Sequence, residues 1–147
     1  GTDALEILIA ERPDVFNHNI ETVARLQRAV RPSAGYARSL SVLARGRSAG
    51  LTTKSGMIVG MGETCQEVEE TLIDLASVGV QIVTIGQYLR PTTNHLPVAR
   101  WVDPKEFDHY KAFGERLGMQ HVQSSPLTRS SYHAKNAHEQ SQIVVHA

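Results

Sequence analysis

The sequence has 147 residues, of which 41% are hydrophobic and 20% are charged, and this balance is typical of a single globular domain with a buried core. Fifteen basic and fifteen acidic side chains cancel, so no overall field favours nucleic acid or a membrane surface as a partner. Every apolar run is too short to span a bilayer. A single cysteine excludes an internal disulfide, and we expect a cytosolic or organellar protein.

Apolar periodicity in the first third of the chain predicts three helices. The residues up to Ile9 have the pattern of the last turns of a helix. A second helix is expected over about residues 20–30, with Asn19 as its N-cap and Pro32 beyond its end. A third is expected over about residues 36–49, where a glycine follows.

Two later helices carry explicit start and stop signals. Thr64 and Glu67 have the spacing of a capping box, in which the hydroxyl and the carboxylate each accept a hydrogen bond from a first-turn amide. Gly79 is placed to end that helix. Asp103, followed by proline, begins the next helix in the same manner, and Gly118 ends it.

Short apolar runs between the helices predict four strands, at about residues 14–16, 55–59, 80–85 and 120–122. The middle two are nearly continuous in isoleucine and valine, which is typical of strands that are buried on both faces. Strands that alternate with helices form parallel sheets. The predicted fold class is therefore α/β.

Polar or glycine-rich clusters follow three of these strands, at residues 17–19, 60–63 and 86–91. Parallel α/β folds place their active sites at the ends of strands. The Asn-His-Asn cluster offers both donors and acceptors to a ligand, although for Asn19 taken alone a helix cap is the favoured interpretation. The two glycines of residues 60–63 permit close backbone approach to a ligand or simply a tight turn. Cys65 stands where a dinucleotide fingerprint requires a third glycine.

Four segments in order resemble lipoyl synthases: residues 17–22, 53–63, 86–97 and 129–134, the last reading Arg-Ser-Ser-Tyr-His-Ala. The resemblance implies a radical S-adenosylmethionine enzyme with a partial (β/α) barrel of the TIM type. It also implies a reaction that inserts two sulfur atoms into an octanoyl chain carried on a protein lysine. We expect the C-terminal portion of such a barrel, with parallel strands and flanking helices.

The resemblance implies two 4Fe-4S clusters and S-adenosylmethionine in the complete enzyme. Because no general base can open an unactivated C–H bond, the cofactor carries the chemistry, and the protein positions and shields the reactants. By resemblance, eight residues are expected to contact S-adenosylmethionine or substrate: Asn17, Asn19, Lys54, Ser55, Gly62, Glu63, Gln87 and Arg90.

The segment at residues 129–134 implies a metal ligand. By resemblance, Ser131 donates its oxygen to the auxiliary 4Fe-4S cluster, and Ser130 is the less favoured alternative. An oxygen ligand suits iron in such a cluster less well than a thiolate does, so a labile bond is expected. A labile ligand fits a cluster that is consumed as the source of sulfur.

The cysteine groups that the resemblance implies for both clusters are not in the sequence, because Cys65 is the single cysteine. We therefore expect residues 1–135 to be the C-terminal part of a barrel, including the serine segment. We expect residues 136–147 to be a disordered tail. The fragment by itself is expected to be inactive.

The implied partners are an octanoylated lipoyl-carrier domain or glycine cleavage H protein and a reducing electron donor, without nucleic acid or membrane. The expected setting is a bacterial cytoplasm, or a mitochondrion or plastid in a eukaryote. Two alternatives stay open: a non-catalytic α/β module that holds a small anion, and a sulfur-inserting relative of the biotin synthase type. Residues 129–134 favour the lipoyl enzymes over the second alternative.

Overall fold

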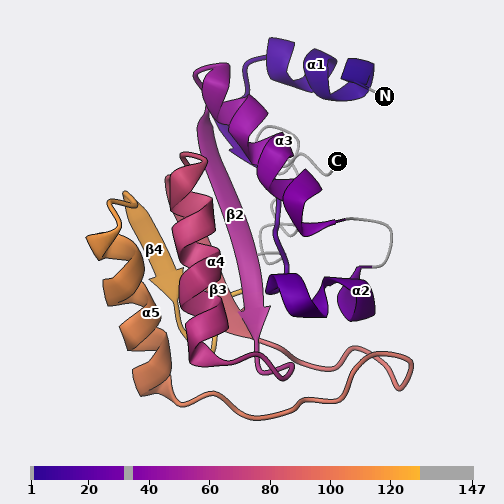
Figure 1. Cartoon of the computed structure of the whole chain (residues 1–147), viewed down its shortest axis with the longest axis vertical. Coiled ribbons are helices and arrows are strands. Elements are labelled where there is room, and N and C mark those ends of the chain that lie inside the picture. Colours follow the sequence, from indigo (N-terminus) through magenta and orange to yellow (C-terminus); the bar gives the residue numbers. More distant parts are fainter. Residues whose placement is uncertain (1, 32–34, 130–147) are drawn as a thin grey trace.

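The computed structural model describes residues 2–31 and 35–129 (Figure 1). Helices and strands alternate along most of this length, as the sequence predicts. In chain order the elements are α1 (Thr2–Ala10), β1 (Val15–Asn17), the 3-10 helix η1 (Ala24–Leu26), α2 (Gln27–Val30), α3 (Tyr36–Ser48), β2 (Thr52–Val59), α4 (Cys65–Ser77), β3 (Ile82–Gln87), α5 (Pro104–Arg116) and β4 (His121–Ser124).

The strands form one sheet in the order β1-β2-β3-β4, and every neighbouring pair is parallel. Its register places Asn17 beside Lys54, and Lys54 beside Ile82. The α/β prediction with a parallel sheet is therefore confirmed.

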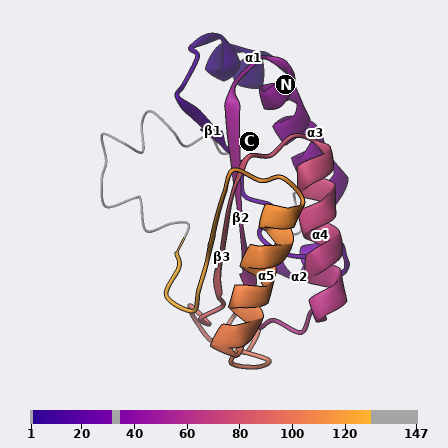
Figure 2. The ribbon, with the colours of Figure 1, turned by 90° about the vertical axis from the view of Figure 1, so that its left-hand side faces the viewer.

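Helices α3, α4 and α5 all lie on the same side of this sheet (Figure 2). Sequential strand order with helices on one face is the arrangement of a (β/α) barrel wall, whereas doubly wound folds reverse the strand order and carry helices on both faces. The described residues thus form an open section of a barrel and do not close it.

The main core lies between the sheet and these helices. Its fully buried side chains include Leu72 and Leu75 from α4, Phe107 from α5, and Val83 and Ile85 from β3. Burial of side chains of this size contributes about 1.5–3 kcal/mol each. A second cluster forms around Phe16, Leu5, Val42 and Leu51. This packing fixes which side of each strand faces the helices.

Both predicted helix starts are confirmed. The Thr64 hydroxyl accepts a hydrogen bond from the Glu67 amide at 3.1 Å, and the Glu67 carboxylate accepts one from the Thr64 amide at 2.9 Å. The Asp103 carboxylate accepts from the Lys105 amide at 2.8 Å. The glycines predicted to end the two helices have positive φ, +85° at Gly79 and +96° at Gly118, as left-handed helix ends require.

The helix predicted over residues 20–30 is wrong in its first half. After β1 the chain bulges and pairs with β2 again at Glu21, whose amide donates to the Gly56 carbonyl at 3.0 Å and whose carbonyl accepts from the Ile58 amide at 2.9 Å. Helical structure begins only at Ala24. Asn19 is therefore not a helix cap, because a strand partner occupies the chain where a first turn was expected.

The strand boundaries shift by one to three residues from prediction. β2 begins at Thr52, three residues earlier than expected, because the polar residues 52–54 still pair with β1. β3 begins at Ile82 and ends at Gln87. Among residues 2–31 and 35–129, the helices lack the combined length and apolarity that crossing a membrane requires.

Candidate active site

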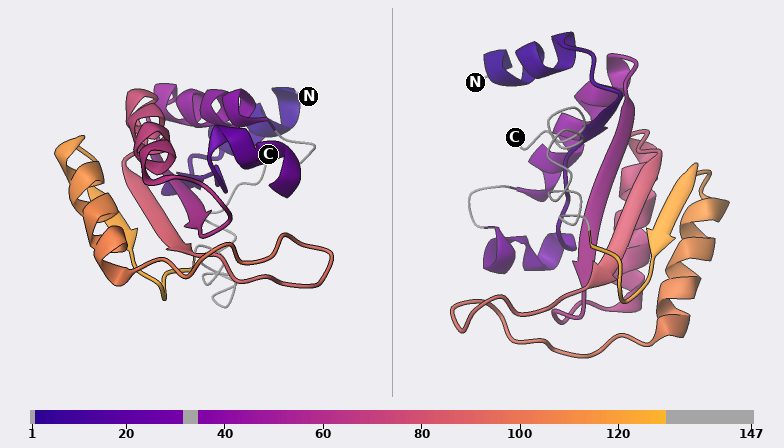
Figure 3. Two further views of the ribbon diagram at one scale, coloured as in Figure 1. Left: turned by 60° about the horizontal axis from the view of Figure 1, so that its bottom comes forward. Right: turned by 180° about the vertical axis from the view of Figure 1, so that it is seen from behind.

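The face of the sheet turned away from α3, α4 and α5 is the candidate active site, and we call it the helix-free face (Figure 3, right). Side chains alternate between the two faces along a strand. Val83 packs in the main core, so its neighbours Ile82 and Thr84 point to the helix-free face. The register then places Lys54 and Asn17 on that face too.

Several buried oxygen atoms at this face or at its edge lack a hydrogen-bond partner among the described residues: Asn17 Oδ1, Asn19 Oδ1 and Thr84 Oγ1. Asn17 is 6% exposed and Thr84 only 2%. Buried polar atoms are normally paired, so each unpaired one calls for a reason such as a ligand or bound water. Asn17 and Asn19 were predicted as ligand contacts, and the structure brings both to this region.

Lys54 lies in the middle of the same face, directly beside Asn17 in the sheet register. Its side chain is half-buried, and burial lowers the pKa of its ammonium group below the ordinary value. A partly desolvated cation interacts more strongly with an anionic group than an exposed lysine does. The contact of Lys54 with S-adenosylmethionine or substrate stays a prediction.

Ser55 lies on the opposite face from Lys54, and its hydroxyl accepts a hydrogen bond from the Ile20 amide at 3.0 Å. Ile20 belongs to the bulge that follows β1, so this bond fixes the backbone that carries Asn19. Ser55 therefore supports the site from the opposite face of the sheet, through the backbone of Ile20.

The glycine turn after β2 is organised by Glu63. This carboxylate is 4% exposed and accepts hydrogen bonds from the amides of Gly60, at 2.9 and 3.0 Å, and Met61, at 3.0 Å. Arg100 lies 3.8 Å away. Gly62 has φ of +120° and nothing within 4 Å of the place a Cβ would take, so space is open beside its backbone. Glu63 holds the turn, and Gly62 is the exposed part of it.

The long loop at residues 88–103 follows β3 (Figure 3), and Gln87, at the end of that strand, binds it. Its Nε2 donates to the carbonyls of Tyr88 at 2.9 Å and Arg100 at 3.2 Å, and its Oε1 accepts from the Val102 amide at 2.9 Å. The Ala99 amide also donates to the Gly60 carbonyl at 2.8 Å. The loop is thus fixed across the carboxyl ends of β2 and β3.

Arg90 lies within this loop and is exposed. Its guanidinium donates to the carbonyls of His95 at 2.9 Å and Thr93 at 2.7 Å. The Thr92 hydroxyl and His95 Nδ1 are 2.8 Å apart. These bonds make Arg90 the centre of a local turn in the loop.

The chain after β4 returns to the helix-free face at Gly86. The register pairs Gly86 with Ile58, both on that face, and the Thr128 carbonyl oxygen packs against Gly86 where a side chain would otherwise stand. Arg129 donates to the carbonyls of Pro126 at 2.9 Å and Thr128 at 2.7 Å. Ser130 and Ser131, the predicted metal ligands, lie outside the described residues, as does the predicted tail at residues 136–147.

Two residues of this region were missed by sequence reasoning. Thr84 was hidden in a nearly continuous apolar run, where one threonine among isoleucine and valine is a weak signal. Arg100 lies in a loop without periodicity, yet its guanidinium forms two bonds with Glu106, at 2.9 and 2.7 Å. A long-range pairing of this kind leaves no local mark in a sequence.

Comparison with known proteins agrees with this geometry. The chain is 56% identical over 142 residues to the lipoyl synthase of Rubrobacter xylanophilus, covering 95% of this chain and 43% of that protein. It is 55% identical over 133 residues to the lipoyl synthase of Pelodictyon phaeoclathratiforme, covering 90% and 45%. It is 54% identical over 133 residues to that of Methylococcus capsulatus, covering 89% and 41%. No protein-family model matches the chain.

The fold defines a section of a parallel (β/α) barrel with a polar helix-free face. The relatives identify the section: the chain belongs to the lipoyl synthase family and corresponds to the C-terminal part of its members. It spans less than half the length of the curated relatives it matches. The resemblance found in the sequence is thereby confirmed.

Proposed function

We propose that this chain forms part of a lipoyl synthase, a radical S-adenosylmethionine enzyme that inserts two sulfur atoms into a protein-bound octanoyl chain. The observation that carries the proposal is the 56% identity to a lipoyl synthase over 95% of the chain. The barrel-wall topology and the unpaired oxygens of the helix-free face support it.

The helix-free face offers hydrogen-bond acceptors that suit the donors of S-adenosylmethionine. This cofactor carries an α-amino group, ribose hydroxyls and an adenine amine, all of which donate hydrogen bonds. Asn17, Asn19 and Thr84 each offer a buried acceptor with no partner among the described residues. Gly62 leaves space beside its backbone. We assign the acceptors of Asn17, Asn19 and Thr84 to the bound cofactor or the substrate beside it.

The described residues do not fit a 4Fe-4S cluster by themselves. Such clusters are held by cysteine thiolates, and Cys65, the single cysteine, lies in the first turn of α4 and not on the helix-free face. The proposed cluster ligand from this chain is Ser131, with Ser130 as the alternative. We propose that these 147 residues alone do not assemble a cluster and do not turn over.

When bound and reduced, S-adenosylmethionine supplies the radical chemistry that opens unactivated C–H bonds. The residues of this chain bind and orient. Lys54 places a partly desolvated positive charge beside Asn17, Glu63 fixes the glycine turn, and Gln87 fixes the loop that covers the strand ends. The proposed partners are an octanoylated lipoyl-carrier domain or glycine cleavage H protein, and a reducing electron donor.

The anion-binding alternative finds less support. A site for a small anion at the glycine turn would use the cations near it, and both described arginines there are already paired. Arg25 binds Glu67 at 2.8 Å and the Gly62 carbonyl at 2.8 Å. Arg100 binds Glu106 at 2.7 Å. An anion would have to displace a carboxylate from one of them.

The test is a chimaera that joins this chain to the part of the Rubrobacter xylanophilus lipoyl synthase that the match does not cover. After incubation with octanoylated carrier, S-adenosylmethionine and a reductant, mass spectrometry should find two sulfur atoms added to the carrier. Unchanged carrier from a folded, cluster-loaded chimaera would contradict the proposal. Within it, Ser131→Ala should depress sulfur insertion while S-adenosylmethionine cleavage continues, and Ser130→Ala should do so much less.

A further inference from the structure

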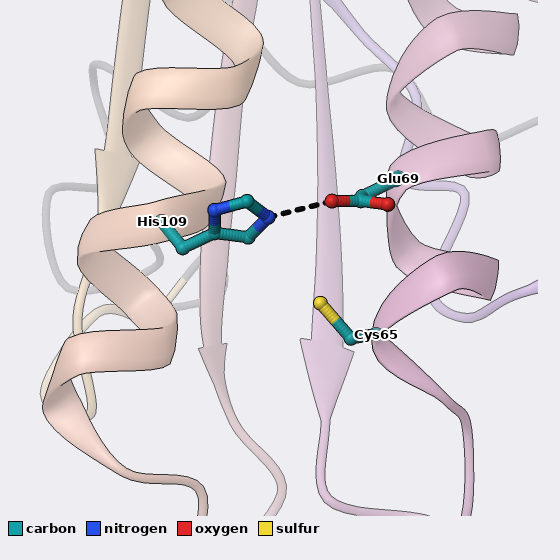
Figure 4. A group of neighbouring side chains, drawn as sticks. All are labelled: Cys65, Glu69 and His109. Carbon is teal, nitrogen blue, oxygen red and sulfur yellow. Dashed lines mark hydrogen bonds and ion pairs between the residues drawn. The ribbon is translucent and has the colours of Figure 1, made fainter.

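Helices α4 and α5 carry three metal-ligating side chains that the proposed function does not use. Cys65 and Glu69 lie one turn apart on α4, and His109 lies on the neighbouring α5 (Figure 4). Their ligand atoms, the thiol sulfur, a carboxylate oxygen and a ring nitrogen, all lie within 4.8 Å of one another. Residues four apart on a helix share a face, so the two α4 ligands point together toward α5.

The spacing is close to that of a coordination sphere. His109 Nε2 lies 2.6 Å from Glu69 Oε2. Around a tetrahedral zinc ion with bonds of about 2.0–2.3 Å, neighbouring ligand atoms are roughly 3.3–3.6 Å apart. An ion would therefore enter by opening this hydrogen bond by less than about 1 Å. The ligand atoms that lie up to 4.8 Å apart would draw together by about 1 Å. Both side chains can make that adjustment, because Glu69 is 27% exposed and His109 is 42% exposed.

The ligand set selects the metal. A thiolate, a carboxylate and a neutral imidazole are ligands that Zn²⁺ accepts in tetrahedral sites, whereas Mg²⁺ and Ca²⁺ require oxygen ligands. The thiolate and the carboxylate together balance the charge of the ion. Three protein ligands leave the fourth position to water, which the exposure of His109 allows.

The surroundings of Cys65 are compatible with this use. The thiol is partly buried, and burial raises its pKa, while a hydrogen bond with Tyr110 acts in the opposite direction. Another carboxylate that acts on Cys65, Glu106, is engaged with Arg100 at 2.7 Å and with the Tyr110 hydroxyl. Glu106 is thus already bound by other groups and is not counted among the ligands. At Cys65, the entering metal would displace the thiol proton.

We propose that Cys65, Glu69 and His109 form a Zn²⁺ site that joins α4 to α5. The site lies in the helix layer, apart from the helix-free face, and one thiolate cannot replace the cysteine set of an iron–sulfur cluster. It therefore stands independently of the proposed sulfur-insertion activity. Because the ion bridges two helices that pack on different strands, Zn²⁺ also stabilises the fold when bound.

Cobalt substitution tests the site with a signal that no other residue can produce. Cobalt(II) bound to a thiolate gives an intense sulfur-to-metal absorption band, and Cys65 is the only cysteine in the chain. Titrating the 147-residue chain with cobalt(II) should produce this band at one equivalent, and Zn²⁺ should remove it. Cys65→Ser should abolish the band, and histidines elsewhere in the chain cannot restore it.

The matched pair of histidine variants supplies the control. His109→Asn should weaken Zn²⁺ binding by more than about tenfold, a loss that even outer-shell partners can cause. His121→Asn, at an exposed position on β4, should leave Zn²⁺ binding unchanged. As a second measurement, Zn²⁺ should protect Cys65 from iodoacetamide in the original chain and in His121→Asn, but not in His109→Asn.

Two results would overturn the proposal. One is a cobalt titration of the folded chain without the thiolate band. The other is equal Zn²⁺ affinity and equal protection of Cys65 in His109→Asn and His121→Asn. Either would show that Glu69 and His109 form an ordinary surface ion pair beside an unrelated thiol. Circular dichroism of each variant separates loss of binding from loss of the fold.

Discussion

The carbonyl oxygen of Thr128 occupies the position that a Cβ would take at Gly86. A real Cβ cannot approach backbone so closely, so the chain after β4 can return to the helix-free face only because β3 carries a glycine there. Ser131 follows Thr128 by three residues. Gly86 thus fixes where Thr128 lies, three residues before the proposed cluster ligand.

The first prediction concerns this contact. Gly86→Ala should displace residues 125–129 or strain β3, and it should lower the free energy of unfolding by about 1–3 kcal/mol. Urea denaturation measures this loss. Gly35→Ala is the control, because nothing lies within 4 Å of its added carbon. Equal stability of the Gly86→Ala variant and the original chain would show that the contact is absent in solution.

The second prediction concerns Gln87. Gln87→Met keeps the size of the side chain but removes the bonds to Tyr88, Arg100 and Val102. Buried partners left unpaired should cost about 1–3 kcal/mol of stability, and the loop at residues 88–103 should exchange its amide hydrogens faster. Gln123→Met, on the exposed end of β4, should change neither quantity. Amide exchange at residues 88–103 that is as slow in Gln87→Met as in the original chain would argue against this account.

The third prediction is a pH dependence. A hydrogen bond from Arg25 and one from the Thr64 amide lower the pKa of Glu67 to about 2, from an ordinary value of 4.5. A carboxyl whose pKa is lower in the folded state stabilises that state when ionised. The contribution is therefore complete above pH 4.5 and is lost as the pH falls toward 2.

Glu67→Gln isolates this contribution, because glutamine can still take part in a capping box. The stability difference between the original chain and Glu67→Gln should be largest near neutral pH and should shrink as the pH falls from 4.5 toward 2. Because the Arg25 side chain is 55% exposed and that of Glu67 is 22% exposed, added salt should reduce this difference. Glu115→Gln, at an exposed site in α5, serves as the control. A stability difference that grows as the pH falls would contradict the lowered pKa of Glu67.

The fourth prediction concerns the stability of two threonine variants, which urea denaturation measures. Thr84→Val removes a buried hydroxyl that has no partner among the described residues, so the chain without ligand should become more stable by about 1 kcal/mol. Thr53→Val should have the opposite effect, because the buried Thr53 hydroxyl donates to the Gly79 carbonyl at 3.2 Å. Destabilisation by Thr84→Val would show that its hydroxyl already has a partner.

Much of the fold could be predicted because its signals are local. The capping box of Thr64 and Glu67, the cap at Asp103 and the glycines that end α4 and α5 depend on residues within one or two turns of each other. The strands were found because isoleucine and valine gather in short runs. Their ends were less accurate, since Thr52 joins β2 through pairing with Val15, a residue far away in the chain.

The remainder depended on contacts between distant residues. Asn19 was expected to cap a helix, but the chain there bonds to β2 and the Ser55 hydroxyl, which no local pattern announces. Glu63 and Gln87 were selected by resemblance as ligand contacts, and the structure shows their bonds to backbone amides and carbonyls. The Cys65, Glu69 and His109 group was not found from the sequence, because its third member comes from another helix.

The central claim is that the helix-free face binds S-adenosylmethionine or the substrate beside it, and Asn17 tests this most directly. In the chimaera, Asn17→Leu should raise the KM for S-adenosylmethionine or for the octanoylated carrier by more than about tenfold, because a buried acceptor lost from a binding site costs about 1–3 kcal/mol. Asn94→Leu, in the exposed loop, should leave both KM values unchanged. Unchanged KM values for both molecules in a folded, cluster-loaded Asn17→Leu chimaera would contradict the account.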